Sequence, residues 1–174
     1  MLKTIAVVVV VLIAGVLVYA ATKPDVFRVQ RTASIKAPPE KIAAVLSDFH
    51  GWQAWSPWEK MDPAMKRSYS GAEKGKGAAY AWEGNGKVGQ GHMEITDAAP
   101  SRVALNLDFI KPFEAHNKVV FTLAPKGDAT EVNWAMQGPV PYLAKIVHVF
   151  MDMDSVVGGQ FEAGLANLKT ITEK

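Results

Sequence analysis

An uninterrupted apolar run at residues 5–21 constrains this chain more than any other feature of its sequence. The run reads IAVVVVVLIAGVLVYAA and carries no charge, and a helix of that length covers about 25 Å, close to the hydrocarbon thickness of a bilayer. Tyr19 lies near one end, where an amphipathic aromatic ring suits the membrane interface. The run predicts a membrane anchor at residues 1–22, with residues 5–21 as its membrane-crossing part.

A secretory signal peptide is the alternative interpretation of the same residues. The apolar part of a signal peptide has about 7 to 15 residues and is followed by small residues at the cleavage site. This run is longer and rich in valine throughout, although residues 18–20 resemble a poor cleavage site. The length favours an uncleaved anchor, and cleavage stays open as the alternative.

The charges that flank the run give conflicting indications about the side of the membrane. Lys3 precedes the run, whereas Lys23, Arg28, Arg31 and Lys36 follow it. The positive-inside rule would keep the following domain in the cytoplasm, but long domains are translocated largely regardless of charge. The basic start resembles an export signal, so we favour an exported, periplasmic or extracytoplasmic domain and leave the side open. The lack of cysteine is compatible with either compartment.

The rest of the chain has the length and charge of one globular domain. Residues 26–174 suit a single core, and residues 23–25 form a linker short enough to hold that domain close to the bilayer. The whole chain has 19 Lys and Arg against 17 Asp and Glu, without a basic block or an alternation of basic and aromatic residues. Nucleic acid is therefore not an expected partner.

The first part of this domain predicts a strand followed by short helices. Residues 27–35 alternate with the period of a half-buried strand, although Arg31 interrupts the apolar face. Pro38 and Pro39 end the strand and suit the first turn of a helix, because their missing N–H groups have no partner there anyway. Apolar residues at helical spacing follow as far as Phe49.

The later sequence changes from strand-like to helix-like periodicity. Residues 66–137 consist of alternating segments separated by turn sequences, which is typical of an antiparallel meander with one apolar face. From residue 143 to 171, apolar residues recur every three or four positions, which predicts one long amphipathic helix with a bend at Gly158-Gly159. We therefore expect an α+β domain in which a curved sheet is covered by a long C-terminal helix.

Three local sequences carry a family resemblance. They are residues 35–42 (IKAPPEKI), residues 52–58 (WQAWSPW) and residues 159–169 (GQFEAGLANLK). Together with the order of elements, they resemble the START-like, or SRPBCC, superfamily in its polyketide cyclase/dehydrase-like branch, and the second string is common in a bacterial subgroup. The resemblance spans about residues 26–172 and implies the helix-grip fold, in which a deep cavity between sheet and long helix binds lipids or hydrophobic small molecules. That superfamily includes enzymes, carriers, receptors and co-chaperone-like domains, so the fold alone does not choose a function.

Aromatic side chains on the inward parity are the predicted lining of that cavity. Trp82 and Trp134 share the apolar parity of their strands, and Trp52, Trp55 and Trp58 lie near the expected mouth, where they would gate the cavity, cap the core or sit at headgroup level. Core packing without a ligand is the competing interpretation, and it is the favoured one for Trp82 and Trp134. The predicted lining comprises Trp55, Trp58, Tyr80, Trp82, Leu107, Phe109, Phe121, Trp134, Met136 and Phe150.

The sequence contains no recognisable catalytic, metal or cofactor motif. It has no GxSxG string and no cysteine, and none of its histidines has a partner at metal-ligand spacing. A buried carboxylate would support acid–base chemistry, but Glu83 and Asp108 share the outward parity of their strands. We therefore predict no catalytic residue, metal site or cofactor, which favours a protein that is not an enzyme. The histidines are His50, His92, His116 and His148.

Three functions remain open from the sequence. The favoured one is membrane-tethered binding of a lipid or another hydrophobic small molecule. The first alternative is a cyclase- or dehydratase-like enzyme that would need at least two titratable groups in the cavity. The second is a protein-interaction or chaperone-like module, which would expose a large apolar patch.

Overall fold

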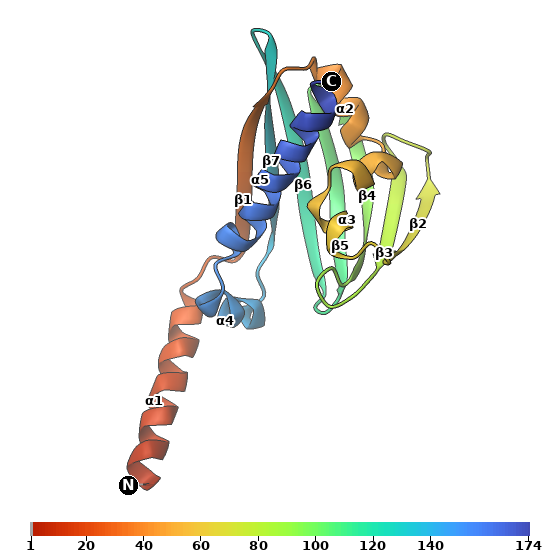
Figure 1. Cartoon of the computed structure of the whole chain (residues 1–174). Coiled ribbons are helices and arrows are strands. Elements are labelled where there is room, and N and C mark those ends of the chain that lie inside the picture. Colours follow the sequence, from red (N-terminus) through yellow and green to blue (C-terminus); the bar gives the residue numbers. More distant parts are fainter. Residues whose placement is uncertain (1) are drawn as a thin grey trace.

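The computed structural model describes residues 2–174 and consists of an N-terminal helix, a seven-stranded antiparallel sheet and helices packed on one face of that sheet (Figure 1). In chain order the elements are α1 (Leu2–Ala21), β1 (Val26–Ile35), α2 (Pro39–Leu46), the 3₁₀ helix η1 (Phe49–Ala54), α3 (Pro57–Met61), β2 (Lys66–Gly71), β3 (Ala78–Glu83), β4 (Gln90–Ala99), β5 (Arg102–Lys111), β6 (Ala115–Lys126), β7 (Ala129–Pro139), α4 (Tyr142–Phe150) and α5 (Met153–Thr172).

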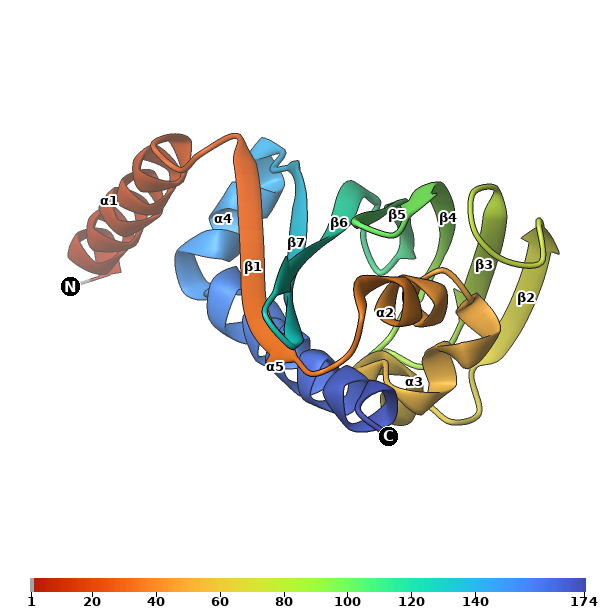
Figure 2. The same ribbon diagram turned by 90° about the horizontal axis from the view of Figure 1, so that it is seen from above.

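The sheet confirms the predicted meander. Its spatial order is β1-β7-β6-β5-β4-β3-β2, so six strands follow one another as hairpins and β1 pairs with the last of them. Figure 2 shows the sheet curving around α2, with α3 and α5 along its open side. Alternate residues of the strands are buried, as the period of two predicts. The α+β fold class expected from the sequence is therefore confirmed.

The C-terminal segment forms two helices where the sequence predicts one. The chain is extended at Met151, and Asp152 caps the next helix by accepting hydrogen bonds from the backbone N–H of Asp154 at 3.1 Å and from the hydroxyl of Ser155 at 2.5 Å. This capping favours a new helix start over continuation of α4. The break thus lies at residues 151–152, whereas the Gly158-Gly159 pair lies within α5.

Arg31, which interrupts the apolar parity of β1, joins the sheet to α5. Its guanidinium donates to the carboxylate of Glu162 at 2.7 Å and to that of Asp154 at 3.0 Å. Gly158 makes room for it, because a Cβ atom there would lie 2.0 Å from a guanidinium nitrogen of Arg31. The inward-pointing Arg31 guanidinium is accommodated because α5 supplies the carboxylates of Asp154 and Glu162 as its partners.

Helix α1 extends away from the domain (Figure 1) and is long and apolar enough to cross a membrane. Nearly all of its side chains are exposed, whereas Ala20 at its end is fully buried. Helix α4 packs beside this end, where the hydroxyl of Tyr142 donates to the carbonyl oxygen of Leu17 at 2.8 Å. The apolar helix is therefore joined to the base of the domain through α4.

Candidate functional site

The space between the sheet and α5 holds an aromatic cluster centred on Trp134. The Trp134 ring stacks on Phe161 of α5, with centroids 4.1 Å apart and planes 9° apart. Phe121 of β6 lies 4.9 Å away, Trp55 lies 5.5 Å away, and Trp58 at the start of α3 lies 5.8 Å away. Sheet and helices thus meet through stacked and edge-on aromatic rings.

A second group of rings extends this cluster toward the other edge of the sheet. Trp82 lies 5.7 Å from Phe109 and 6.1 Å from Tyr80, measured between ring centroids. Leu107 and Phe109 are half-buried on β5, and Met136 is buried on β7. Nine of the ten predicted lining residues therefore belong to one apolar interior. Their contact with a ligand stays a prediction.

Two buried indole groups in this interior have no hydrogen-bond partner among the described residues. They are the N–H groups of Trp55 and Trp134. By contrast, the indole of Trp52 donates to the carbonyl oxygen of Leu46 at 3.1 Å, and that of Trp82 donates to Val88 at 2.9 Å. A buried donor without an acceptor costs free energy, so these two groups mark places where a hydrogen-bond acceptor would be stabilising.

Glu59 is a buried carboxylate that no local sequence pattern predicts. Glu59 is only 7% exposed, accepts a hydrogen bond from the Tyr80 hydroxyl at 2.6 Å and pairs with the Arg67 guanidinium at 2.8 Å. Burial, followed by the contact with Glu59, raises the pKa of Tyr80 well above its usual range. Because the phenol stays protonated and Arg67 neutralises the carboxylate, the arrangement is typical of a structural ion pair rather than a proton shuttle.

A cleft of about 530 Å³ lies at the base of the domain, between β1 and the α4–α5 junction. Its walls combine polar and apolar surface in similar amounts. They include both the inward residues Phe27 and Val29 and the outward residues Val26 and Arg28 of β1, so the cleft lies at this edge of the sheet. Charged side chains lie among them. The lining residues are Lys23, Pro24, Val26, Phe27, Arg28, Val29, Val140, His148, Val149, Phe150, Met151, Asp152, Met153 and Asp154.

Phe150, the tenth predicted lining residue, belongs to this cleft and not to the aromatic interior. It ends α4 and is largely exposed. The sequence placed it on the stripe of a single long helix, and the break before α5 moves it to the base of the domain. His148 beside it is half-buried, and burial, followed by the charge of Lys23, lowers its pKa.

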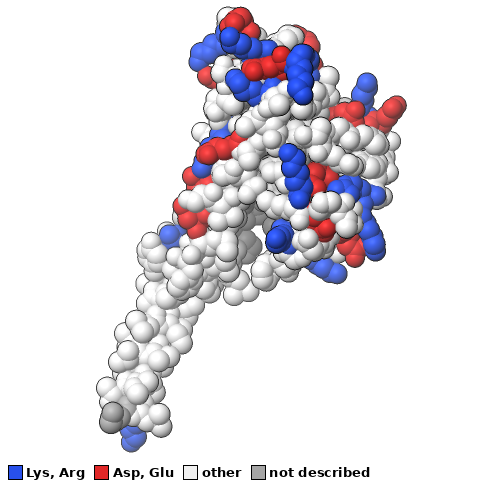
Figure 3. All heavy atoms as spheres, viewed as in Figure 1, with Lys and Arg blue, Asp and Glu red and all other residues white. Residues whose placement is uncertain are grey.

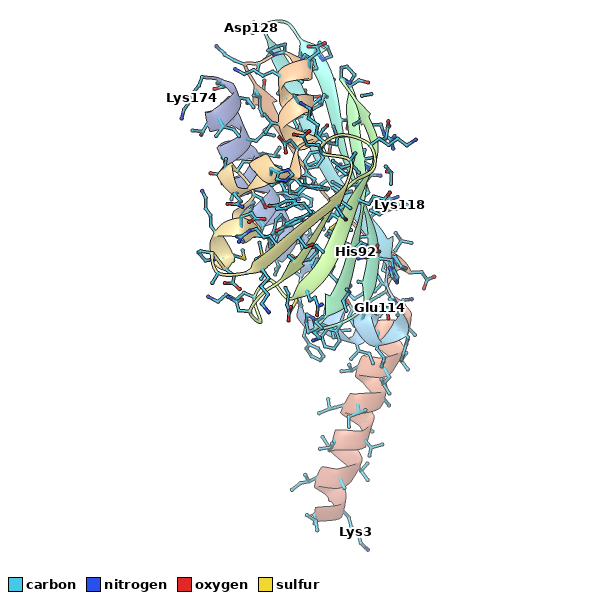
Figure 4. All side chains as sticks on the ribbon, turned by 90° about the vertical axis from the view of Figure 1, so that its right-hand side faces the viewer. Lys3, His92, Glu114, Lys118, Asp128 and Lys174 are labelled. Carbon is cyan, nitrogen blue, oxygen red and sulfur yellow. The ribbon has the colours of Figure 1, made fainter. Side chains whose placement is uncertain are left out.

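The outward groups lie where their parity predicts. Asp108 on the outer face contacts His116 at 2.7 Å and His92 at 3.2 Å, and Figure 4 shows His92 and Glu114 on that side of the sheet. Glu83 is exposed at the end of β3. Within residues 2–174, no group of histidine and acidic side chains has the arrangement that a metal ion requires.

Comparison with known proteins agrees with this architecture. A sequence profile described as polyketide cyclase/dehydrase and lipid transport matches residues 26–173. No curated protein gives a significant match to the chain.

Several solved structures share the fold. Protein CV1439 from Chromobacterium violaceum aligns with a TM-score of 0.60 and 14% identity over 87% of this chain and 99% of its own. The Aha1 dimer from Colwellia psychrerythraea gives 0.59 and 18% identity over 84% and 96%. Truncated norcoclaurine synthase from Thalictrum flavum gives 0.62 and 11% identity over 84% and 92%. At these identities the similarity shows the fold alone, and it confirms the helix-grip fold expected from the sequence.

Proposed function

This chain belongs to the polyketide cyclase/dehydrase and lipid transport family, within the START-like superfamily, and from this premise we propose that it is a membrane-tethered protein that binds a lipid or another hydrophobic small molecule. The observation that carries the proposal is the cleft of about 530 Å³ that follows directly on the apolar helix α1. Its volume falls within the range of about 300–1,000 Å³ that is usual for small-molecule sites.

The chemistry of the cleft suits an amphiphile. Apolar side chains such as Phe27, Val149 and Met153 would contact the apolar body, which stabilises a complex by about 25 cal/mol per Å² before ordering costs. Two cations, Lys23 and Arg28, and two carboxylates, Asp152 and Asp154, lie among them, so the charges balance and would suit a zwitterionic or strongly polar head. The tether keeps this site at the bilayer, where such ligands dissolve.

The aromatic interior is the deeper seat that the sequence predicts for the same ligand. The unpaired indole N–H groups of Trp55 and Trp134 favour a molecule that brings a carbonyl, ester or hydroxyl oxygen to either of them. Arg31 pairs in register with Trp134 and contacts Asp154, a lining residue of the cleft, so it lies between the two places. A ligand that reaches the interior from the cleft would have to pass this residue.

Photo-crosslinking of the full chain in phospholipid vesicles tests the proposal. A phospholipid with a diazirine on its acyl chain is activated, and the labelled peptides are identified by mass spectrometry. Adducts on residues 26–29 and 148–154 support the cleft, and adducts on Trp55 or Trp134 support the deeper seat. Adducts confined to α1 would contradict the proposal.

A pair of variants sharpens this experiment. Met153→Trp adds a ring to the wall of the cleft and should reduce the adducts there several-fold. Val156→Trp, one turn along α5 at an exposed position outside the cleft, is the matched control and should leave them unchanged. Intact-mass measurement of the same sample shows whether residues 1–22 are retained, as an anchor requires, or removed, as a signal peptide would be.

A further inference from the structure

The base of the domain exposes apolar side chains that a water-facing surface would normally bury. On α4, Leu143 is 77% exposed, Val147 is 46% exposed and Phe150 is 77% exposed. These residues are four and three positions apart, so they share one face of the helix. The face of α4 that points away from the domain is therefore its apolar face, the reverse of the usual pattern.

Helix α4 has no free charge to oppose contact with an apolar phase. Its one Lys or Arg residue, Lys145, is buried and pairs with the carboxylate of Asp25 at 2.5 Å. Figure 3 shows α1 and the neighbouring base of the domain almost free of charged side chains on the face in view, whereas charged side chains cover the upper domain.

The contact between α4 and α1 indicates how deep α4 would lie in a bilayer that α1 crosses. Tyr142 donates to the carbonyl oxygen of Leu17, four residues before the end of α1. At a rise of 1.5 Å per residue, the Tyr142 hydroxyl at the start of α4 lies about 6 Å back along the helix axis from Ala21. If α1 spans the bilayer, this contact places α4 at the boundary between headgroups and acyl chains.

The turn between β5 and β6 reaches the same end of the domain. Phe109 pairs with Ala115, and β6 then runs antiparallel to β7, whose end pairs with the start of β1 beside the anchor. The tip of this hairpin lies at the level of α4 in both Figure 1 and Figure 4, with Asp128 at the opposite end. At the tip, Phe113 is 78% exposed, and Ile110 is also exposed.

We propose that Leu143, Val147 and Phe150 of α4, together with Ile110 and Phe113 of the β5–β6 turn, form an apolar collar that inserts into the lipid interface around the end of α1. The collar rests on the proposed membrane tether and adds a second, peripheral contact with the bilayer. Aromatic and aliphatic side chains on a helix without free charges suit burial in the interfacial region. Because Phe150 also lines the cleft, the collar places the cleft at the lipid surface, so a ligand would pass from the bilayer into the protein without crossing water.

Site-specific depth measurement tests the collar on the full chain. The sequence has no cysteine, so single cysteines can carry a nitroxide label without any other substitution. Leu143→Cys, Phe150→Cys and Phe113→Cys report on the collar, and Val9→Cys reports on α1. Asp128→Cys, at the opposite end of the domain, is the aqueous reference. In vesicles of phosphatidylcholine and phosphatidylglycerol, the measured quantity is the ratio of collision rates with oxygen and with a water-soluble nickel chelate.

The proposal expects a ratio several-fold higher at the three collar positions than at position 128, with the highest ratio at position 9. A high ratio at position 9 with aqueous ratios at the collar would overturn the collar and leave the anchor standing. Aqueous ratios at position 9 would instead count against the tether itself. Collar labels that are immobilised and shielded from both reagents would identify a protein partner or a second copy at this surface, and would also overturn the proposal.

Discussion

The Nε group of Arg31 donates to the carboxylate of Glu162 at 2.7 Å and so fastens the edge strand β1 to α5. The same guanidinium also donates to Asp154, which lies nearer the start of α5 than Glu162. This hydrogen bond lowers the pKa of the Asp154 carboxyl. Both carboxylates are largely exposed, so the interaction lies at the margin of the core. Its structural requirement is space on α5, and Gly158 provides that space.

Replacing Gly158 with alanine should therefore lower stability relative to the same change at Gly159. A Cβ atom at position 158 would lie 2.0 Å from Arg31, so the guanidinium must retract and lose its contacts with α5, whereas nothing lies within 4 Å of a Cβ at position 159. Gly159→Ala should stabilise the domain by about 0.5–1 kcal/mol, because alanine is the better helix former. Thermal unfolding of the full chain in detergent measures the difference.

An Arg31→Ala background provides the internal control for this comparison. Without the guanidinium, the difference in stability between the two alanine variants should shrink, because the interaction energy between positions 31 and 158 disappears. If the difference stayed the same in that background, the clash with Arg31 would not be its cause.

Gly164→Ala should destabilise the domain by about 1–3 kcal/mol, the usual cost of overpacking a core. A Cβ atom there would lie 2.7 Å from the ring of Trp134 and 3.2 Å from Pro57. Both neighbours are rigid, and the Trp134 ring is already in contact with Phe161 and Phe121. Denaturant unfolding followed by tryptophan fluorescence measures the change. A loss no larger than that of Gly158→Ala would show that the aromatic cluster is looser than its geometry indicates.

The sequence predicts the sheet well because the alternation of apolar and polar residues that identifies a strand is a local property of the chain. Alternation with a period of two identifies the inward residues of β6 and β7, and this places Phe121 and Trp134 in the interior. Successive side chains of a strand point to opposite faces of the sheet, so the inward set can be identified without knowing the partner strand. The outward positions of Glu83 and Asp108 follow for the same reason.

The remaining features depend on contacts between distant residues. Glu59 lies in the five-residue helix α3, and only folding brings it to Tyr80 and Arg67, so no local period identifies it as buried. The break between α4 and α5 did have a local signal, since Asp152 followed by Ser155 is a capping pattern. The apolar spacing continues through that pattern, so the sequence predicts one long helix and places Phe150 on the face that lines the cavity.

Removing the buried carboxylate of Glu59 should be strongly destabilising. Glu59→Gln leaves the Arg67 guanidinium without its counter-charge at a site where both side chains are largely buried. Breaking one partner of a buried ion pair costs about 3–5 kcal/mol. The matched control is Glu83→Gln, which removes an exposed partner of Lys66 at 3.8 Å and should change stability by less than about 1 kcal/mol. Denaturant unfolding of the two variants side by side checks the contrast, and equal losses would contradict it.

His116 should titrate above its ordinary range because of Asp108. The hydrogen bond to Asp108, measured at 2.7 Å, raises the pKa of the His116 imidazole, and the nearby Glu114 acts in the same direction. Asp108→Asn should therefore lower the pKa of His116, which the pH dependence of its ring proton shifts in the NMR spectrum reports. Asp97→Asn, which removes a partner of Arg102 instead, is the control and should leave the titration unchanged.

The same contact sets the sign of a stability change with pH. A histidine whose pKa is raised on folding stabilises the folded state when it is charged, so its contribution is fully present below the unfolded pKa of about 6.5. The contribution is lost as the pH rises through the raised folded value. The wild-type chain should therefore exceed Asp108→Asn in melting temperature by more at about pH 6, where His116 is charged and Asp108 is ionised, than at about pH 9. A difference that is independent of pH would mean that Asp108 stabilises the sheet without the charge of His116.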